Sequence, residues 1–257
     1  MARNDRYAHE RDFWNEFSAT SRRYAATAFG NKVDEGYIPL GHPWADSRAF
    51  IYRQIGDVAG KRVLDCGAGT GWLSIVMARR GAAEVTAIDV SDRMLELLRD
   101  LARENGVTGR IRTRATAIET AEFPAGSFDV VACVDVLHHT DVGNAVHRIH
   151  GWLRPGGIAV ISDPLADSRT VEWAKGIVPV RRMGTETERG LRLAELLDAC
   201  HGFSRIEHRE FQLFSRLDRL VHHRTVRGAL LRLDAALLAA FPPLRRFARI
   251  TVVRAVK

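Results

Sequence analysis

The sequence predicts an α/β protein with an open, mostly parallel sheet, an antiparallel last strand and helices on both faces. Short apolar segments alternate with amphipathic ones from residue 61 to about residue 211, which is typical of a parallel sheet covered by helices. A glycine-rich loop follows the first apolar segment, where such sheets bind ligands. All apolar runs are far shorter than the roughly 20 residues of a membrane span, so we expect a globular protein.

Strands are expected where the apolar runs are short and rich in β-branched residues, and helices where apolar residues recur every three or four positions. The helix after the second strand has the clearest signals, because Ser91 can cap its start and Gly106 can end it. Its expected inward face consists of Met94, Leu95, Leu97, Leu98 and Leu101. The expected strands are 62–66, 84–88, 110–114, 128–134, 158–163, 204–211 and 248–256, and the expected helices are 72–80, 93–105, 142–153 and 191–201.

Three further segments surround this predicted core of residues 59–211. Residues 1–58 have helix and loop patterns without a strand signal, and we expect them to form a helical lid. Residues 212–246 repeat apolar residues at helical spacing until Pro242 and Pro243, which predicts inserted amphipathic helices that serve as a cap, an interface or a membrane contact. Residues 247–257 supply the last strand of the core sheet.

The net charge of +7 is concentrated at the end of the chain, where 12 Lys and Arg stand against 4 Asp and Glu from residue 200 onward. This distribution permits an anionic partner, but no run of aromatic residues is interleaved with the arginines, which favours a solvated basic face. Cys66, Cys133 and Cys200 lie far apart in apolar segments, so we expect buried thiols, no metal site and a cytoplasmic protein.

The glycine-rich loop reads VLDCGAGTG at residues 63–71. Its three glycines allow main-chain amides to approach a ligand at the start of the next helix. A dinucleotide site has the pattern GxGxxG, and Trp72 stands where its third glycine would fall, which argues against a dinucleotide. Asp89 ends the second strand about 20 residues later, where a carboxylate can accept hydrogen bonds from both ribose hydroxyls of an adenosine.

Together with AIDVS at 87–91, FDVVACVDVLHHT at 128–140 and LRPGG at 153–157, the loop resembles the Rossmann-like class I S-adenosylmethionine-dependent methyltransferases. The resemblance covers residues 61–163 and implies S-adenosylmethionine as cofactor and S-adenosylhomocysteine as product. It implies that Asp65 orders the loop and faces the methionine amino group, and that Asp89 holds the ribose. Ala117 stands where relatives often have an adenine-binding Asp, so Ile118 is expected to contact the adenine. The implied cofactor-binding residues are Asp65, Gly67, Ala68, Gly69, Asp89, Val90, Ala117, Ile118, Val134 and Asp135.

Candidate catalytic residues follow the fourth and fifth strands. His138 and His139 lie at the carboxyl end of the fourth strand, and a neutral imidazole there can remove a proton from an acceptor. Consecutive side chains point in different directions, so at most one is expected to face the methyl group, and either can instead bind the main chain. Asp163 can orient that histidine, bind substrate or cap a turn. Further candidates in the N-terminal segment are Tyr7, His9, Tyr37 and His42.

The acceptor is expected to be a small molecule that receives the methyl group on oxygen or nitrogen. Nucleic-acid base methylation is disfavoured, because the fourth strand ends in Val134-Asp135-Val136-Leu137 and offers no aromatic face for a flipped base. We expect an enzyme of bacterial secondary metabolism, and the excess of Arg over Lys, 34 to 4, indicates a GC-rich coding sequence. Three alternatives stay open: a lipid or quinone acceptor reached through peripheral membrane contact, a homodimer interface on the inserted helices, and a cofactor-binding module without transferase activity.

Overall fold

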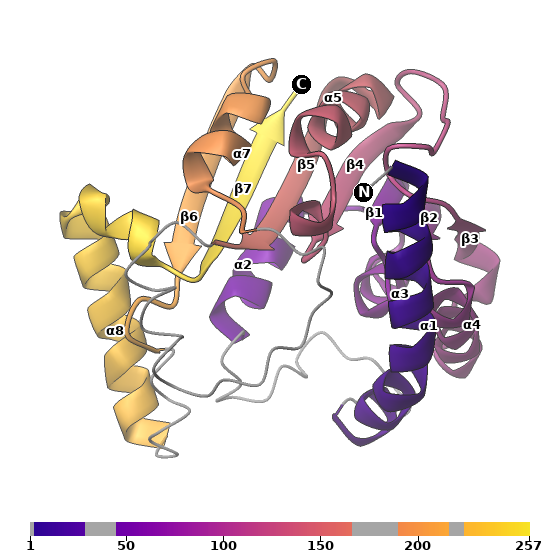
Figure 1. The fold of residues 1–257 in the computed structure, drawn as a ribbon, viewed down its shortest axis with the longest axis horizontal. Coiled ribbons are helices and arrows are strands. Elements are labelled where there is room, and N and C mark those ends of the chain that lie inside the picture. Colours follow the sequence, from indigo (N-terminus) through magenta and orange to yellow (C-terminus); the bar gives the residue numbers. More distant parts are fainter. Residues whose placement is uncertain (1–2, 29–44, 166–189, 216–223) are drawn as a thin grey trace.

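The computed structural model describes residues 3–28, 45–165, 190–215 and 224–257. A seven-stranded sheet with the order β3-β2-β1-β4-β5-β7-β6 forms the centre of the molecule (Figure 1). Strands β1 to β5 pair in parallel, and β7 runs antiparallel to both of its neighbours, which confirms the predicted fold class. The strands are β1 Arg62–Cys66, β2 Glu84–Asp89, β3 Ile111–Ala115, β4 Phe128–Val134, β5 Leu153–Pro164, β6 Arg205–Phe211 and β7 Ile250–Val256.

Helices cover both faces of the sheet. Helices α2, α3 and α4 pack on one face, and α5 and α7 pack on the other. Helix α1 lies outside this first layer, against α4, and α8 stands at the far edge beside β6 (Figure 1). The helices are α1 Arg3–Ala28, α2 Ala45–Ile55, α3 Trp72–Arg79, α4 Asp92–Glu104, α5 Val142–Trp152, α7 Leu193–Ala199 and α8 Arg224–Ala240.

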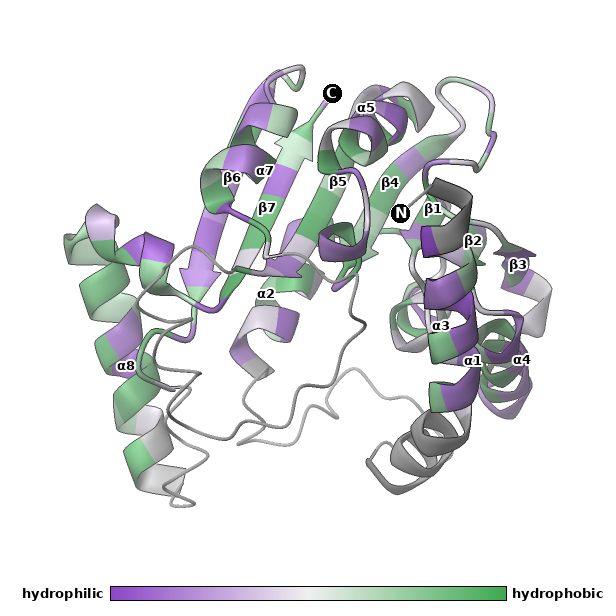
Figure 2. Ribbon diagram, viewed as in Figure 1, coloured by the Kyte–Doolittle hydropathy of each residue, from purple (hydrophilic) through white to green (hydrophobic). Residues whose placement is uncertain are grey.

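The core divides into two clusters because successive side chains of a strand point to opposite faces. Val63 of β1 packs with the α2, α3 and α4 face, whereas Leu64 and Cys66 pack with α5 and α7. Figure 2 shows β1, β4 and β5 hydrophobic along most of their length. These strands have helices on both sides, which explains why their sequences are nearly continuous apolar runs. Cys66, Cys133 and Cys200 are buried free thiols, as predicted.

The structure differs from the sequence prediction in two segments. Strand β5 begins at Leu153, five residues early, because Leu153 pairs with Phe128 before an irregularity restores the main register at Ile158. A 3-10 helix at Pro242–Phe247 separates α8 from β7, and its two prolines occupy first-turn positions that need no N–H donor. Residues 216–223 of the predicted amphipathic insertion lie outside the described residues. None of the helices described is long and apolar enough to cross a bilayer.

Candidate cofactor and active site

The predicted site residues converge on one edge of the sheet. The parallel register places Cys66 of β1 beside Ile88 of β2 and Cys133 of β4, so the loops that follow these three strands are neighbours. Strand β5 continues the series, with Ser162 beside Val134. The carboxyl edge of β1, β2, β4 and β5 therefore collects the glycine loop, the acidic residues and the two histidines, which is where open α/β sheets bind ligands.

The glycine loop is hydrogen-bonded to β2 and packed against neighbouring side chains, but it is open at Gly69. The amides of Gly67 and Ala68 both donate to the Ile88 carbonyl, at 2.8 and 3.0 Å. A Cβ atom on Gly67 would lie 2.4 Å from the Val136 side chain, and one on Gly71 would lie 2.2 Å from Leu98, so packing demands both glycines. A Cβ on Gly69 would meet nothing within 4 Å. Gly69 therefore borders free space through which a ligand can approach the loop.

Asp65 and Asp89 hold the loop from two sides. The buried Asp65 carboxylate accepts a hydrogen bond from Ser74 Oγ at 2.6 Å, and desolvation raises its pKa to about 6. Asp89 accepts from the amides of Gly69 and Ser91, at 2.8 and 2.9 Å. Desolvation also raises the pKa of Asp89, although these main-chain hydrogen bonds oppose the increase. Both residues lie where the sequence places cofactor contacts, and both carry charge that is incompletely compensated.

Asp135 is strained as well as charged. Its φ of 57° lies in the left-handed region, which is unusual for a residue other than glycine. Desolvation, followed by the charge of nearby Asp163, raises the pKa of Asp135 to about 6, while His138, Arg48 and Arg249 act in the opposite direction. Backbone strain of this kind persists only where surrounding structure enforces it, and it is frequent at functional sites. Val134, the preceding residue, is half-buried at the end of β4.

The three carboxyl groups at this edge fit the predicted cofactor. Asp65, Asp89 and Asp135 all have raised pKa values, chiefly because burial disfavours their ionised forms, which positive charge on a ligand would stabilise. S-adenosylmethionine carries a sulfonium and an ammonium group, so its binding would supply that charge. The open space before Gly69 and the half-buried Val90 after Asp89 lie on the same edge. The chemistry of the site therefore agrees with a cationic adenosyl ligand.

The adenine end of the predicted site has a different character. Ala117 and Ile118 are buried, and the Ala117 carbonyl accepts from the amides of Thr120 and Ala121. The Ile118 side chain packs in the core cluster beneath α5, while its carbonyl accepts from Arg148 Nε at 3.2 Å. This packing leaves the Ile118 main-chain amide as the predicted adenine contact.

The two adjacent histidines each pair with a carboxylate. His138 Nδ1 lies 2.6 Å from Asp163 Oδ1, and Asp163 also accepts from the amides of Leu137 and His138, so this carboxylate fixes the loop after β4. His139 Nδ1 lies 3.2 Å from Glu10 Oε1 of α1, and Trp14 donates to the other Glu10 oxygen at 3.1 Å. The two imidazole rings are 4.0 Å apart. His138 is thus held by the sheet, whereas His139 is held by the N-terminal helix.

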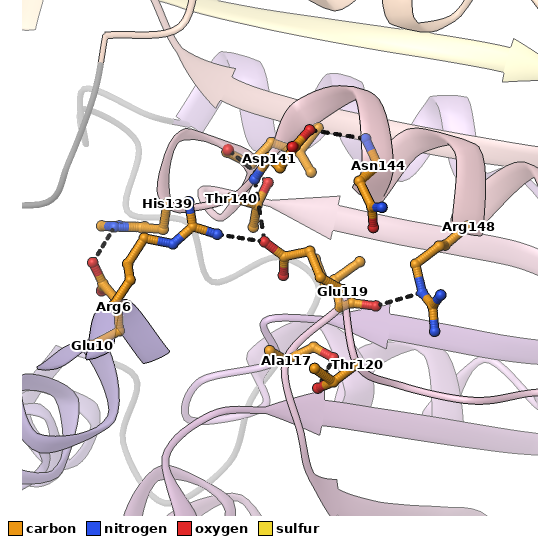
Figure 3. Close-up of polar contacts among 12 residues, drawn as sticks. Arg6, Glu10, Ala117, Glu119, Thr120, His139, Thr140, Asp141, Asn144 and Arg148 are labelled. Atoms are coloured by element: carbon orange, nitrogen blue, oxygen red, sulfur yellow. Dashed lines mark hydrogen bonds and ion pairs between the residues drawn. The ribbon is translucent and has the colours of Figure 1, made fainter. Parts of the chain in front are cut away.

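Helix α1 crosses the carboxyl edge and binds three loops. Arg6 forms an ion pair with Glu119 at 2.7 Å, Glu10 contacts His139, and Asn15 accepts from Ser91 Oγ at 2.7 Å (Figure 3 for the first two). These partners follow β3, β4 and β2 respectively. The sequence prediction missed Arg6, Glu10 and Asn15, because no spacing pattern links residues so far apart in the chain.

Four further candidates came from the N-terminal segment of the sequence. Tyr7 and His9 lie on α1, and Tyr37 and His42 lie outside the described residues. Within the parts of the chain that the structure describes, no three His, Cys, Asp or Glu residues are grouped so as to hold a metal ion.

Comparisons with known proteins point to one family. A family described as a methyltransferase domain matches residues 63–157, from β1 into β5. Ubiquinone biosynthesis O-methyltransferase of Pseudomonas aeruginosa is 40% identical over 125 residues, which are 48% of this chain and 50% of that protein. The protein of the same name from Pseudomonas syringae pv. tomato is 35% identical over 164 residues, 62% of this chain and 67% of that protein. The chain thus spans about half the length of several curated relatives that it matches.

Solved structures share the fold at lower identity. Phosphoethanolamine N-methyltransferase 2 of Haemonchus contortus in complex with S-adenosyl-L-methionine has a TM-score of 0.66 at 20% identity, covering 96% of this chain and 59% of that one. The [4+2]-cyclase SpnF has a TM-score of 0.63 at 19% identity, covering 96% and 95%. At these identities the likeness establishes the fold alone.

Proposed function

Because the chain belongs to the class I S-adenosylmethionine-dependent methyltransferases, whose cofactor is S-adenosylmethionine, we propose that it methylates a hydroxyl oxygen of a small-molecule acceptor. The observation that carries this proposal is the buried pair of His139 and Glu10 beside the acidic cofactor edge. Relatives at 35 and 40% identity are named O-methyltransferases, which supports oxygen over nitrogen.

The cofactor supplies an activated methyl group, so this chain needs mainly to bind the cofactor and the acceptor, to align them, and to exclude water from the site. Asp89 is placed to hold the ribose, and Asp65 and Asp135 provide negative charge for the cationic end. His139 Nδ1 faces Glu10, so its Nε2 atom is the one that can take a proton. We assign His139 as the base that accepts the hydroxyl proton of the acceptor. Bound S-adenosylmethionine would supply the methyl group to that oxygen, its carbon–sulfur bond breaking, and would leave as S-adenosylhomocysteine. Glu10 stabilises the resulting imidazolium, and Asp163 positions the loop through His138.

A paired base favours a hydroxyl acceptor on chemical grounds. An amine can arrive neutral and a carboxylate is already ionised near neutral pH, so neither acceptor needs a base as much as a phenol or alcohol does. The closed polar contacts of α1 would also keep water from the reacting atoms. We further propose that residues 1–58 and 212–246 together roof the acceptor, that the enzyme acts in the cytoplasm, and that nucleic acid is not its substrate.

A lipid or quinone acceptor at a membrane surface is the second candidate. On α8, Val226 and Leu233 are 40 and 46% exposed, and Phe241 at its end is 56% exposed. Asp234, the only acidic residue between residues 224 and 249, is buried, whereas this stretch contains six arginines. Basic amphipathic helices of this kind bind anionic membranes. The relatives are named for ubiquinone biosynthesis, which agrees with a lipophilic acceptor. A homodimer formed through the same face is the competing interpretation.

The test combines product analysis with one substitution. Purified protein is incubated with S-adenosylmethionine and panels of phenols, amines and carboxylates, and S-adenosylhomocysteine is quantified beside the methylated product. His139→Ala should lower turnover by about a hundredfold, which is the lower range for loss of a general base. Its affinity for S-adenosylhomocysteine should stay within about twofold of wild type.

His147→Ala, an exposed histidine on α5, is the matched control and should retain full turnover. Wild-type turnover in His139→Ala would remove it as the base. Cofactor binding without methylated product from any acceptor would favour a cofactor-binding module that catalyses no methyl transfer.

A further inference from the structure

A cavity of about 230 Å³ lies at the same edge of the sheet but away from the cofactor residues. It is bounded by α2, the end of β6 and α8. Strand β6 runs parallel to β5, and Phe211 at its end stands in register with Ile250 and Pro164, so the cavity opens on the carboxyl edge. Three strand spacings separate β6 from β4, which is about 14 Å. A cavity of about 150 Å³ admits benzene, so this one has room for a substituted aromatic ring.

Two arginines border this cavity, Arg53 from α2 and Arg209 from β6. Both guanidinium groups lie over the Phe50 ring, at 5.6 and 5.4 Å from its centroid, and Arg209 also lies 5.2 Å from the Phe211 centroid. Ring contacts hold these cations in place without neutralising them. Within the described ranges, no carboxylate forms an ion pair with Arg53 or Arg209.

Two of the three carboxylates in the cavity wall, Glu210 and Asp234, are already engaged. Glu210 Oε1 lies 2.7 Å from His208 Nδ1 and 3.2 Å from Thr251 Oγ1, and Glu210 Oε2 lies 3.7 Å from Arg245. Only the exposed Asp46 then remains to balance the two guanidinium groups.

Asp234 is the most completely bonded of these acids. Its oxygens accept from the main-chain amides of Leu213, Phe214 and Ser215 at 2.8 to 3.0 Å. They also accept from the Ser215 hydroxyl at 2.7 Å. These bonds compensate its charge and join α8 to the end of β6. The remaining wall is apolar, with Phe211, Leu231 and Leu238. The cavity thus presents an apolar wall next to two arginines without a carboxylate partner.

We propose that this cavity binds the distal end of the methyl acceptor, a carboxylate or phosphate attached to an apolar body. The anionic group lies between Arg53 and Arg209, which suit planar, bidentate recognition of such oxyanions. The apolar part packs on Phe211 and Leu238. That the ligand is the methyl acceptor rests on the proposed function. Binding of an anion in the cavity does not, because it does not require methyl transfer.

The binding test compares two probes of nearly equal shape, 2-naphthoate and the neutral 2-naphthamide, by calorimetry with protein saturated in S-adenosylhomocysteine. The anion should bind about tenfold more tightly than the amide, in keeping with a charge-assisted contact. The double variant Arg53→Gln/Arg209→Gln should lose this preference. Arg205→Gln is the control, because Arg205 lies at the other end of β6 and pairs with Glu207. Absence of naphthoate binding, equal binding of the probes, or a preference that survives in the double variant would overturn the site.

A kinetic experiment then tests the identity of the ligand. With any acceptor that the enzyme methylates, 2-naphthoate should inhibit competitively against the acceptor and not against S-adenosylmethionine. Inhibition that is not competitive against the acceptor would overturn its assignment to this cavity. A chain that binds naphthoate as expected but methylates nothing would instead contradict the proposed function and leave the anion site standing.

Discussion

At the scale of single residues, the most informative group is Asp65. It is buried, it has one strong hydrogen bond to Ser74, and its pKa is raised to about 6. The ionised carboxylate therefore destabilises the protein at neutral pH in the absence of a cationic partner. Residues that serve binding commonly carry such a cost.

The Asp65→Asn variant should accordingly be more stable than wild type without cofactor. The folded state holds the Asp65 proton more tightly than the unfolded state, so wild-type stability falls as pH rises from about 4 to about 6. We expect the substitution to raise the free energy of unfolding by about 1–3 kcal/mol at neutral pH, since one pKa unit corresponds to about 1.4 kcal/mol. Urea unfolding should show this gain near pH 7.5 and about half of it near pH 5.

The same variant should bind S-adenosylhomocysteine at least tenfold more weakly, about 1.4 kcal/mol, because the carboxylate is lost. Asp92→Asn is the matched control, an exposed acid in the first turn of α4, and should leave both quantities nearly unchanged. A variant less stable than wild type at neutral pH would show that Asp65 stabilises the apo protein.

The position of a residue in the fold is predictable from sequence where spacing within one segment carries the signal. Asp65 and Asp89 lie at strand ends beside a glycine loop, and the structure places both at the carboxyl edge. Glu10 has no such local signal, since 129 positions separate it from His139. Only the docking of α1 brings the two together, so the sequence identified the imidazole but not its carboxylate.

At the scale of elements, the described side chains of α1 reach the site through polar groups and one ring contact. Figure 2 shows the coloured part of this helix mostly hydrophilic, and its contacts to the site are the pairs formed by Arg6, Glu10 and Asn15 and the edge contact of Trp14 with the His139 ring. Polar attachments are weaker per contact than a buried apolar face, because each group gives up hydrogen bonds to water. Helix α1 should therefore open at a lower free energy than α5, which buries an apolar stripe.

Hydrogen exchange can test this attachment. In Arg6→Gln/Asn15→Ala, amides of α1 should exchange about thirtyfold faster, since two hydrogen bonds worth about 1 kcal/mol each are lost. Exchange in α5 should stay unchanged. Glu16→Gln, an exposed position on the same helix, is the control. Equal exchange of α1 in all three proteins would show that apolar packing holds it in place.

The elements of the core were predictable because periodicity and turn residues agree there. Ser91 does cap α4, accepting from the Met94 amide at 3.1 Å, and Gly106 follows its end. The early start of β5 was not predictable, since it depends on pairing across an irregular register with Phe128. The 3-10 helix before β7 was also missed, because Pro242 and Pro243 indicate only where a helix ends.

At the scale of the whole molecule, positive charge and exposed apolar side chains gather at the β6 and α8 end. Neutral side chains of Leu233 and Phe241 can enter a bilayer interface while nearby arginines meet anionic lipid. The opposite edge, at β3, has no comparable group of exposed large apolar residues among those described.

Vesicle flotation tests the membrane candidate. With anionic phosphatidylglycerol vesicles at low salt, wild-type protein should float, and Leu233→Asp/Phe241→Asp should remain in solution because burying a charge in the interface is costly. Thr108→Asp, an exposed position next to β3, should float like wild type. If wild type stays in solution, the membrane candidate is wrong, and sedimentation of the same variants would test the homodimer.

The placement of Glu10 on α1 has a consequence for the timing of a catalytic cycle. The helix that spans the loops after β2, β3 and β4 also carries the carboxylate that faces His139. If this helix swings away to exchange product for fresh cofactor, His139 loses its partner at the same moment. An open enzyme would then be a poor proton acceptor, and the activated methyl group would meet a competent base only after closure. Opening of α1 would set the upper limit on turnover, as lid motions do in many enzymes.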